Sequence, residues 1–261
     1  MNMVLTRFAM LLVLSSQVAA RTLYNFASCP YSCSCSAVND DLLVVDCKTS
    51  PTSDRLLSEQ LHSLLHSNLT YGHLKLTVTG TLLVQRSVCS LTTLIELRLE
   101  NGLFSHLPDD CFANLTALKM LSAFGNNIKK LQDNVFYGLH KLETLDLSKN
   151  RISSIGLQAF AGLQSLKTLD LRQNRISSIG LQVLAGIREL QTLYLSTNFI
   201  TELQGRLFNG LSNMLILDLS YNRISELRDE FLMDLASCKH CLCSTTAYPR
   251  LGYECFQNFP V

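Results

Sequence analysis

Hydrophobic residues return at fixed intervals between residues 94 and 237, where one pattern repeats six times with a period of 24 residues. The six units begin at Leu94, Leu118, Leu142, Leu166, Leu190 and Met214. Positions four and six of each unit are leucine, except for Ala123 in the second unit. Because side chains alternate across a β-strand, positions four and six point to one side and their neighbours to the other. The pattern therefore predicts one short strand in each unit, with both of these side chains buried.

A polar residue interrupts this pattern at position nine, which is asparagine from the second unit onwards. The five are Asn126, Asn150, Asn174, Asn198 and Asn222. A carboxamide both donates and accepts hydrogen bonds, so it satisfies backbone groups of adjacent turns where the chain leaves the strand. The first unit differs, because Gly102 holds its ninth position and Asn101 comes one residue earlier. We expect the five asparagines to be buried and hydrogen-bonded.

Position nineteen fills the opposite side of each unit with Phe112, Phe136, Phe160, Leu184, Phe208 and Leu232. One unit alone cannot bury these side chains, whereas stacked units bury them in a continuous core. The repeated LxxLxLxxN pattern resembles the leucine-rich repeat family. The resemblance implies an α/β leucine-rich repeat solenoid: a curved horseshoe arc with a parallel concave sheet, a short helical or irregular convex side and a disulfide-rich N-terminal cap. We expect a sheet of about seven strands.

Less regular repeats precede these units, in residues 48–93. Leu74 and Leu76 match the inward pair of an earlier strand. This register puts Thr79 in the asparagine position and Cys89 in the phenylalanine position. The predicted domains are a signal peptide in residues 1–20, an N-terminal cap in 21–47, irregular first repeats in 48–93, six regular repeats in 94–237 and a short cysteine-containing C-terminal segment in 238–261.

The first 20 residues are typical of a secretory signal peptide, with a basic Arg7, an apolar run and small residues up to Ala20. No later stretch reaches the about 18 apolar residues that a bilayer crossing needs, so we expect a secreted, extracellular protein without a membrane span. Cleavage removes one of 22 basic residues and none of 21 acidic ones, which leaves a neutral chain. Neutrality argues against nucleic acid as a partner. The sequence indicates no cofactor and no metal.

Four cysteines, Cys29, Cys33, Cys35 and Cys47, gather in the N-terminal cap. Thiols in an oxidising compartment mostly form disulfides, and four cysteines allow three connectivities. The CPYSCSC motif and the fourth cysteine resemble the cysteine-rich cap of extracellular leucine-rich repeat proteins. That resemblance implies the pairs Cys29–Cys35 and Cys33–Cys47.

Six further cysteines lie outside this cap. Cys89 and Cys111 occupy nearly the same position in consecutive units. Because neighbouring strands lie about 4.8 Å apart, equivalent positions of stacked coils are close together, which predicts a Cys89–Cys111 disulfide. The alternative is two buried, reduced thiols. After Ser237 the repeat stops, and we expect the cysteines of the C-terminal segment to pair among themselves in an undetermined order. These are Cys238, Cys241, Cys243 and Cys255.

No nucleophile–base pair, phosphate-binding glycine loop or metal-binding helix motif is present, which predicts that the protein is not an enzyme. Function is instead expected on the concave sheet, where exposed aromatic and apolar side chains with charged neighbours favour contact with another protein. The predicted ligand-binding residues are Arg98, Glu100, Met120, Phe124, Arg172, Tyr194, Phe199, Ile216 and Tyr221. Glycosylation sequons at Asn68 and Asn114 fall on the opposite flank and leave this sheet open.

The signal peptide, the CPYSCSC cap and units such as LETLDLSKNRISSIGLQAFAGLQS are most similar to the N-terminal part of a Toll-like receptor ectodomain, or of a related secreted leucine-rich repeat protein. This resemblance implies recognition of a protein or microbial ligand in innate immunity, with a signalling co-receptor as a further partner. Two alternatives stay open. One is a matrix or adhesion protein, and the other is a truncated membrane-receptor ectodomain.

Overall fold

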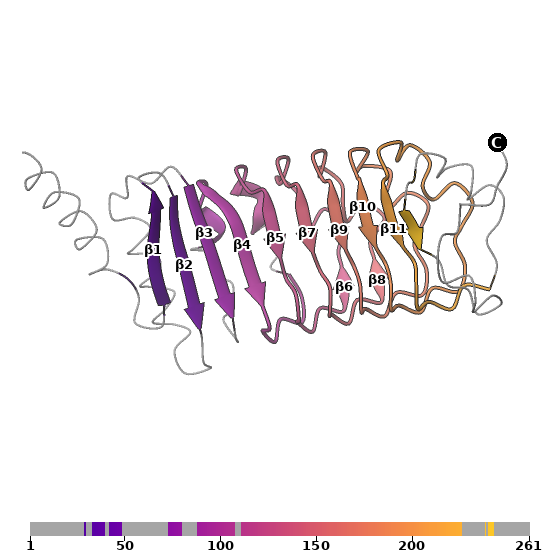
Figure 1. Ribbon diagram of the computed structural model, residues 1–261, viewed down its shortest axis with the longest axis horizontal. Helices are drawn as coiled ribbons and strands as arrows, with labels where there is room; N and C mark the ends of the chain where they lie inside the picture. Colours follow the sequence, from indigo (N-terminus) through magenta and orange to yellow (C-terminus); the bar gives the residue numbers. More distant parts are fainter. Residues whose placement is uncertain are drawn as a thin grey trace, which may run out of the picture.

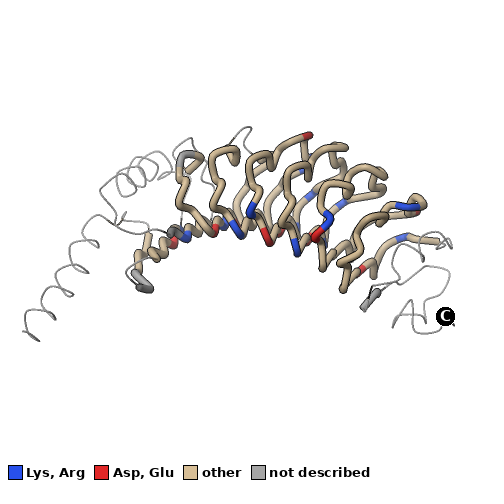
Figure 2. The backbone as a smooth tube through the Cα atoms, turned by 90° about the horizontal axis from the view of Figure 1, so that it is seen from above, with Lys and Arg blue, Asp and Glu red and all other residues tan. Residues whose placement is uncertain are grey.

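The computed structural model describes Cys29 and residues 33–39, 42–48, 73–79, 88–107, 111–225, 238 and 240–242. These residues form a solenoid in which coils stack side by side and their strands form a continuous sheet (Figure 1). Seen from above, the stack is an arc with the strands on its inner, concave side (Figure 2). The predicted signal peptide, Asn68, Cys243 and Cys255 lie outside the described residues.

The sheet has ten strands, more than the seven that the repeats predicted. In order these are β1 (Cys33–Asn39), β2 (Leu42–Lys48), β3 (His73–Thr79), β4 (Leu94–Glu100), β5 (Met120–Ser122), β7 (Thr144–Asp146), β9 (Thr168–Asp170), β10 (Thr192–Tyr194), β11 (Ile216–Asp218) and β12 (His240–Leu242). Neighbouring strands are parallel except β1 and β2, which are antiparallel. The cap thus adds a hairpin to the sheet, which pairs backbone groups that an open sheet edge would leave exposed.

The repeat also continues beyond Ser237, where the sequence predicted its end. β12 pairs in register with β11, so that His240 lies opposite Ile216 and Cys241 opposite Leu217. This spacing is again 24 residues, and Cys241 therefore occupies position four. A cysteine in place of leucine hides the repeat from the hydrophobic pattern, although cysteine also packs as a small apolar residue.

The predicted register of the early strand β3 is wrong by two residues. Leu76 and Val78 are the buried pair, and they lie opposite Leu97 and Leu99. Thr79 consequently faces Glu100 at position seven and does not take the place of the asparagine. Leu74, Leu76 and Val78 alternate along the strand, so the hydrophobic pattern fits either pair, and an irregularity between Leu74 and Lys75 in the pairing with β4 also breaks the constant spacing between units.

The convex side consists of turns, two 3-10 helices, η1 (Val88–Ser90) and η2 (Phe112–Asn114), and a small parallel sheet of β6 (Lys130–Leu131) and β8 (Ser154–Ile155). Phe112, Phe136 and Phe160 stack in a file with ring centroids 6.0 and 6.1 Å apart. Val88 continues this file, because Leu91 donates to its carbonyl as Leu115 donates to that of Phe112. The prediction that Cys89 holds the phenylalanine position is therefore wrong by one residue.

Each position-nine asparagine joins two coils. In Asn174, Nδ2 donates to the carbonyl of Leu147 in the preceding coil at 3.0 Å and to that of Leu171 in its own coil at 3.1 Å. Its Oδ1 accepts the N–H of Ile152 in the preceding coil at 2.9 Å. The other four asparagines repeat this arrangement, and all five are buried, as predicted. These bonds hold adjacent coils at a constant offset beyond the ends of the strands.

Position eight of all six units has a left-handed backbone, with φ between 52° and 71°. The residues are Asn101, Gly125, Lys149, Gln173, Thr197 and Tyr221. Asparagine and glycine adopt this conformation at low cost, whereas other residues are held there at a cost of about 1 kcal/mol or more. This turn aims the side chains at positions eight and ten along one rim of the sheet.

Disulfides join Cys29 to Cys35, Cys33 to Cys47 and Cys89 to Cys111. The second ties β1 to β2 with the two Cα atoms 4.0 Å apart, and the third joins two neighbouring coils. These are the pairs expected from the resemblance and the phase, and the alternative of two reduced thiols does not hold. Cys238 is also disulfide-bonded.

Candidate ligand-binding surface

The inner side of the sheet presents the residues that alternate with the buried leucines. Among the nine side chains predicted to bind a ligand, Arg172, Phe199 and Tyr221 are exposed. The other six are half-buried: Arg98, Glu100, Met120, Phe124, Tyr194 and Ile216. Their partners divide them into an N-terminal ionic group, a central group and a C-terminal aromatic group.

The ionic group is centred on Arg98 of β4. Its Nε lies 2.6 Å from Glu96, its Nη1 lies 3.2 Å from Glu100, and its Nη2 donates to Sδ of Met120 at 3.2 Å. Lys75 of β3 adds a second ion pair to Glu96 at 2.8 Å. Partial burial raises the pKa of Glu96, but hydrogen bonds with Lys75 and Arg98 outweigh it and hold that pKa below its ordinary value. The charges of this group therefore largely neutralise one another.

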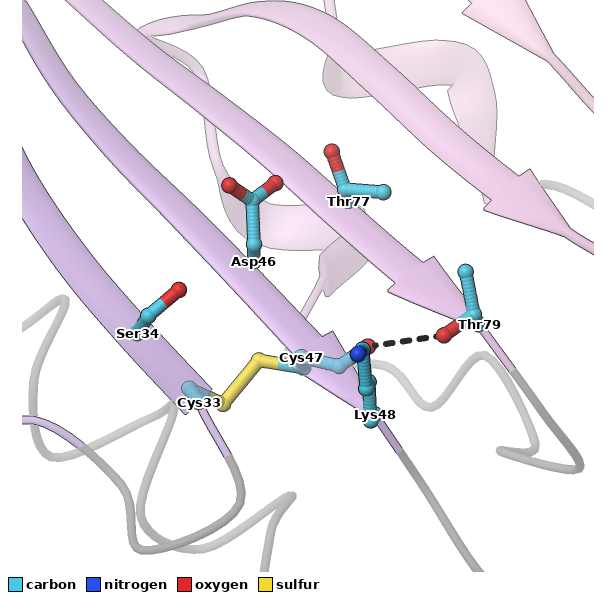
Figure 3. A pocket seen from close by; sticks show the side chains of 7 residues that line it. All are labelled: Cys33, Ser34, Asp46, Cys47, Lys48, Thr77 and Thr79. Carbon is cyan, nitrogen blue, oxygen red and sulfur yellow. Dashed lines mark hydrogen bonds between the residues drawn. A yellow bond between two sulfur atoms is a disulfide. The ribbon is translucent and has the colours of Figure 1, made fainter.

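A hollow of about 570 Å³ adjoins the ionic group at the N-terminal end of the sheet (Figure 3). It is lined by Cys33, Ser34, Asp46, Cys47, Lys48, Thr77 and Thr79. Thr77 and Thr79 lie opposite Arg98 and Glu100, so the hollow lies directly beside the ionic group. Thr79 also donates to the carbonyl of Cys47 at 3.4 Å, which ties β3 to β2 beneath the hollow.

The central group combines aromatic rings with basic side chains from neighbouring coils. Lys149 lies over the ring of Phe124 at 5.0 Å, and Arg172 lies over the ring of Tyr194 at 4.5 Å. Arg172 also donates from Nε to Asp170 at 3.0 Å, and this hydrogen bond raises the pKa of the guanidinium. Such contacts favour one arrangement of both members of each pair, by about 0.5–1 kcal/mol at exposed sites.

The aromatic group lies near the C-terminal end of the described repeats. Phe199 is 40% exposed and Tyr221 is 78% exposed. Arg223 lies over the ring of Phe199 at 4.6 Å. Large exposed aromatic side chains beside an arginine are characteristic of residues that dominate binding energy at protein interfaces.

Sequence reasoning missed four residues of this surface. Lys149 and Arg223 contact predicted residues of adjacent coils, Glu96 pairs with the predicted Arg98 of its own strand, and Lys75 pairs with Glu96. Their phase offers a signal that could have identified them. Lys149 at position eight follows Phe124 at position seven by one coil, and Arg223 follows Phe199 by a full period of 24 residues. Residues at equal or adjacent phase become neighbours once coils stack.

Neither a metal centre nor a membrane helix emerges from the described part of the chain. No group of three or more histidine, cysteine, aspartate or glutamate residues there could hold a metal ion. Likewise, none of the helices described is long and apolar enough to cross a bilayer. An arc of stacked coils with an open parallel sheet on its inner side is instead the architecture of a repeat-built binding scaffold.

A comparison with models of protein families identifies the family of the chain. The model for the leucine rich repeat matches residues 92–152, 124–176, 140–198 and 188–240, which together cover more than half of the chain. The protein therefore belongs to the leucine-rich repeat family. Comparison with curated proteins finds no match.

Several solved structures share the fold. One is TLR13 in its complex with ssRNA13, at 24% identity and a TM-score of 0.54, covering 71% of this chain and 30% of that one. The LRR protein LIC12759 of Leptospira interrogans has 24% identity and a TM-score of 0.58, over 70% of this chain and 44% of that one. Internalin C2 of Listeria monocytogenes has 24% identity and a TM-score of 0.55, over 72% and 75%. The chain thus spans less than half the length of the first two.

Proposed function

We propose that this protein is an extracellular recognition protein that binds a protein or microbial ligand on its concave face and acts in innate immunity. The disulfides support an oxidising compartment, because thiols inside cells are kept reduced. The hydrophobic pattern of residues 1–20 supports secretion. Two proteins of similar fold were solved with ligands, TLR13 with ssRNA13 and the plant peptide hormone receptor RGFR1 with RGF2.

One observation carries this proposal. Aromatic side chains that belong to no core lie along the concave side, and basic side chains from neighbouring coils hold Phe124, Tyr194 and Phe199 in place. These contacts favour one orientation of each ring in the free protein, which lowers the entropic cost of ordering the rings on binding. Asn114 is exposed at the end of η2 on the convex side, so a glycan there would leave the concave face open.

The binding test uses the full chain, secreted from mammalian cells, against immobilised microbial cell-wall products and collagen. The test variant combines Phe124→Ala, Tyr194→Ala and Tyr221→Asn, with asparagine at 221 because that backbone is left-handed at φ 55°. The control is Tyr137→Ala, an aromatic residue that is 62% exposed on the convex side. We expect the triple variant to lose binding to a microbial product while the control keeps it.

Three results would count against the proposal. Unchanged affinity in the folded triple variant would place the site elsewhere. Binding to collagen alone would favour the adhesion or matrix role. Retention of the chain in the cell without disulfides would favour a truncated receptor. Secretion itself predicts a mature N-terminus at Arg21 and a glycosidase-sensitive mass that Asn114→Gln reduces.

A further inference from the structure

The net charge of the whole chain is only +1, but basic and acidic residues are separated along its repeats. Positions eight to twelve of the six units contain no aspartate or glutamate and five basic residues. These five, named here the basic rim, are Lys129, Lys149, Arg151, Arg175 and Arg223. Positions two to seven of the same units contain six acidic and only four basic residues. The concave strands are therefore slightly acidic, and the rim beside them is strongly basic.

Backbone hydrogen bonds place the three rim arginines in one file. The N–H groups of Arg151, Arg175 and Arg223 donate to position-eleven carbonyls of their preceding coils at 3.0, 2.9 and 2.8 Å. Phe199 makes the same bond at 2.9 Å between Arg175 and Arg223. The file thus advances by one coil per residue, close to the strand spacing of about 4.8 Å.

The charges of the basic rim have no acidic partners in the described part of the chain. All five side chains are exposed. The ion pairs in the described residues instead join Lys75, Arg98, Lys167 and Arg172 to acids. The neighbouring strand acids already have hydrogen-bond donors of their own, since Asp146 and Asp218 accept from serines and Asp170 from Arg172.

The chemistry of the rim fits a carboxylate-bearing polypeptide. Guanidinium groups bind carboxylates through two parallel hydrogen bonds, and arginine and aromatic residues together are the typical anchors of protein interfaces. Phe199 interrupts the file of charges and offers an apolar contact between two arginines. A polyanion without apolar or aromatic groups gains nothing from that ring, and the acidic strands repel any anionic ligand that extends from the rim onto the sheet.

We propose that the basic rim docks an acidic, extended segment of the partner protein. Its carboxylates pair with Arg151, Arg175 and Arg223, and an apolar or aromatic side chain between them packs on Phe199. This inference rests on the proposed function, because the same partner covers the concave face. It adds the chemical nature of the segment that must lie along the rim.

The experiment measures binding of a fluorescent peptide in which glutamate alternates with glycine around one central tyrosine. The test variant is Arg151→Glu with Arg175→Glu. Its control is Lys141→Glu with Arg188→Glu, which makes the same change of net charge at exposed turn positions outside the strands and the basic rim. We expect the rim variant to bind the peptide about tenfold or more weakly, the control to bind normally, and added salt to weaken binding by the wild-type protein.

Heparin oligosaccharide and single-stranded oligouridylate serve as competing polyanions. If either binds through the rim arginines more tightly than the peptide, the assignment to a protein segment is wrong. It is equally wrong if the peptide does not bind, or if rim and control variants bind it alike while both fold normally by circular dichroism. A ligand lost by the concave triple variant but kept by the rim variant would refute this inference and leave the proposed function intact.

Discussion

Replacing one position-nine asparagine tests whether these residues hold the coils together. In Asn174→Ala, the carbonyls of Leu147 and Leu171 each keep a donor, because Asn150 binds the first at 3.0 Å and Asn198 the second at 2.9 Å. The buried N–H of Ile152 loses its acceptor, because it donates to Oδ1 of Asn174 at 2.9 Å. The substitution therefore leaves one buried donor unpaired.

An unpaired buried donor costs about 1–3 kcal/mol, so we expect Asn174→Ala to lower the free energy of unfolding by that amount. Asn174→Asp should cost more, because a carboxylate cannot donate to the carbonyls and brings a charge into their midst. Asn126→Ala should cost at least as much, because besides the partly buried N–H of Phe104 it takes the donor from the buried carbonyl of Leu99, and Gly102 in the preceding unit supplies no replacement. Asn209→Ala, on the exposed convex side, is the control and should change stability by no more than about 0.5 kcal/mol.

The assay is urea unfolding followed by circular dichroism with the disulfides intact, together with hydrogen exchange of the Ile152 amide. A common m-value across the variants is required, because repeat proteins can unfold in stages. We expect faster exchange at Ile152 only in the Asn174 variants. The reasoning fails if Asn174→Ala matches the Asn209 control, or if Asn174→Asp is as stable as the wild-type protein.

Three further variants probe other features of the coils. Thr197→Asn should raise stability by about 0.5–1 kcal/mol in urea unfolding, because asparagine tolerates the left-handed backbone at φ 58°; a loss would show that the threonine side chain matters more. Replacing Cys89 and Cys111 by alanine opens a crosslink with a sequence separation of 22 and should lower stability by about 3 kcal/mol, measured against the wild-type protein with its disulfides intact. Glu96 has a folded pKa below its ordinary 4.5, so its stabilisation is complete above that pH and declines as the pH falls through the folded pKa. Glu96→Gln should flatten the acid branch of stability against pH, and an unchanged branch would assign the acid sensitivity to other carboxyl groups.

The six-fold repetition made much of the regular fold predictable. Positions four, six and nineteen are buried in each described unit for the same reason, and the asparagine at position nine meets the same backbone groups each time. Because the pattern recurs six times, a single exception such as Ala123 does not change the predicted fold. The Cys89–Cys111 disulfide could also be predicted, because the two cysteines occupy similar positions in consecutive units. This holds even though the predicted position of Cys89 was wrong by one residue.

The candidate surface was only partly predictable. The repeat pattern identified Phe124, Tyr194 and Tyr221 as residues outside the core. It could not show that Lys149 lies over the ring of Phe124 and Arg172 over the ring of Tyr194. These contacts depend on side-chain directions between coils. The hollow beside Cys33 and Cys47 was missed altogether, because it requires the cap strands to join the sheet.

By itself, the sequence determined the stacking of coils, because each 24-residue unit has an apolar set that only an adjacent unit can cover. Tertiary structure alone decided how the stack ends and what its surface offers. The antiparallel cap hairpin, the irregularity at Leu74 and the in-phase strand at His240 arise from pairing between segments whose spacing or composition departs from the repeat. The alignment of the rim arginines likewise follows from hydrogen bonds between coils, so a chain with a net charge of only +1 presents a basic rim beside a slightly acidic sheet.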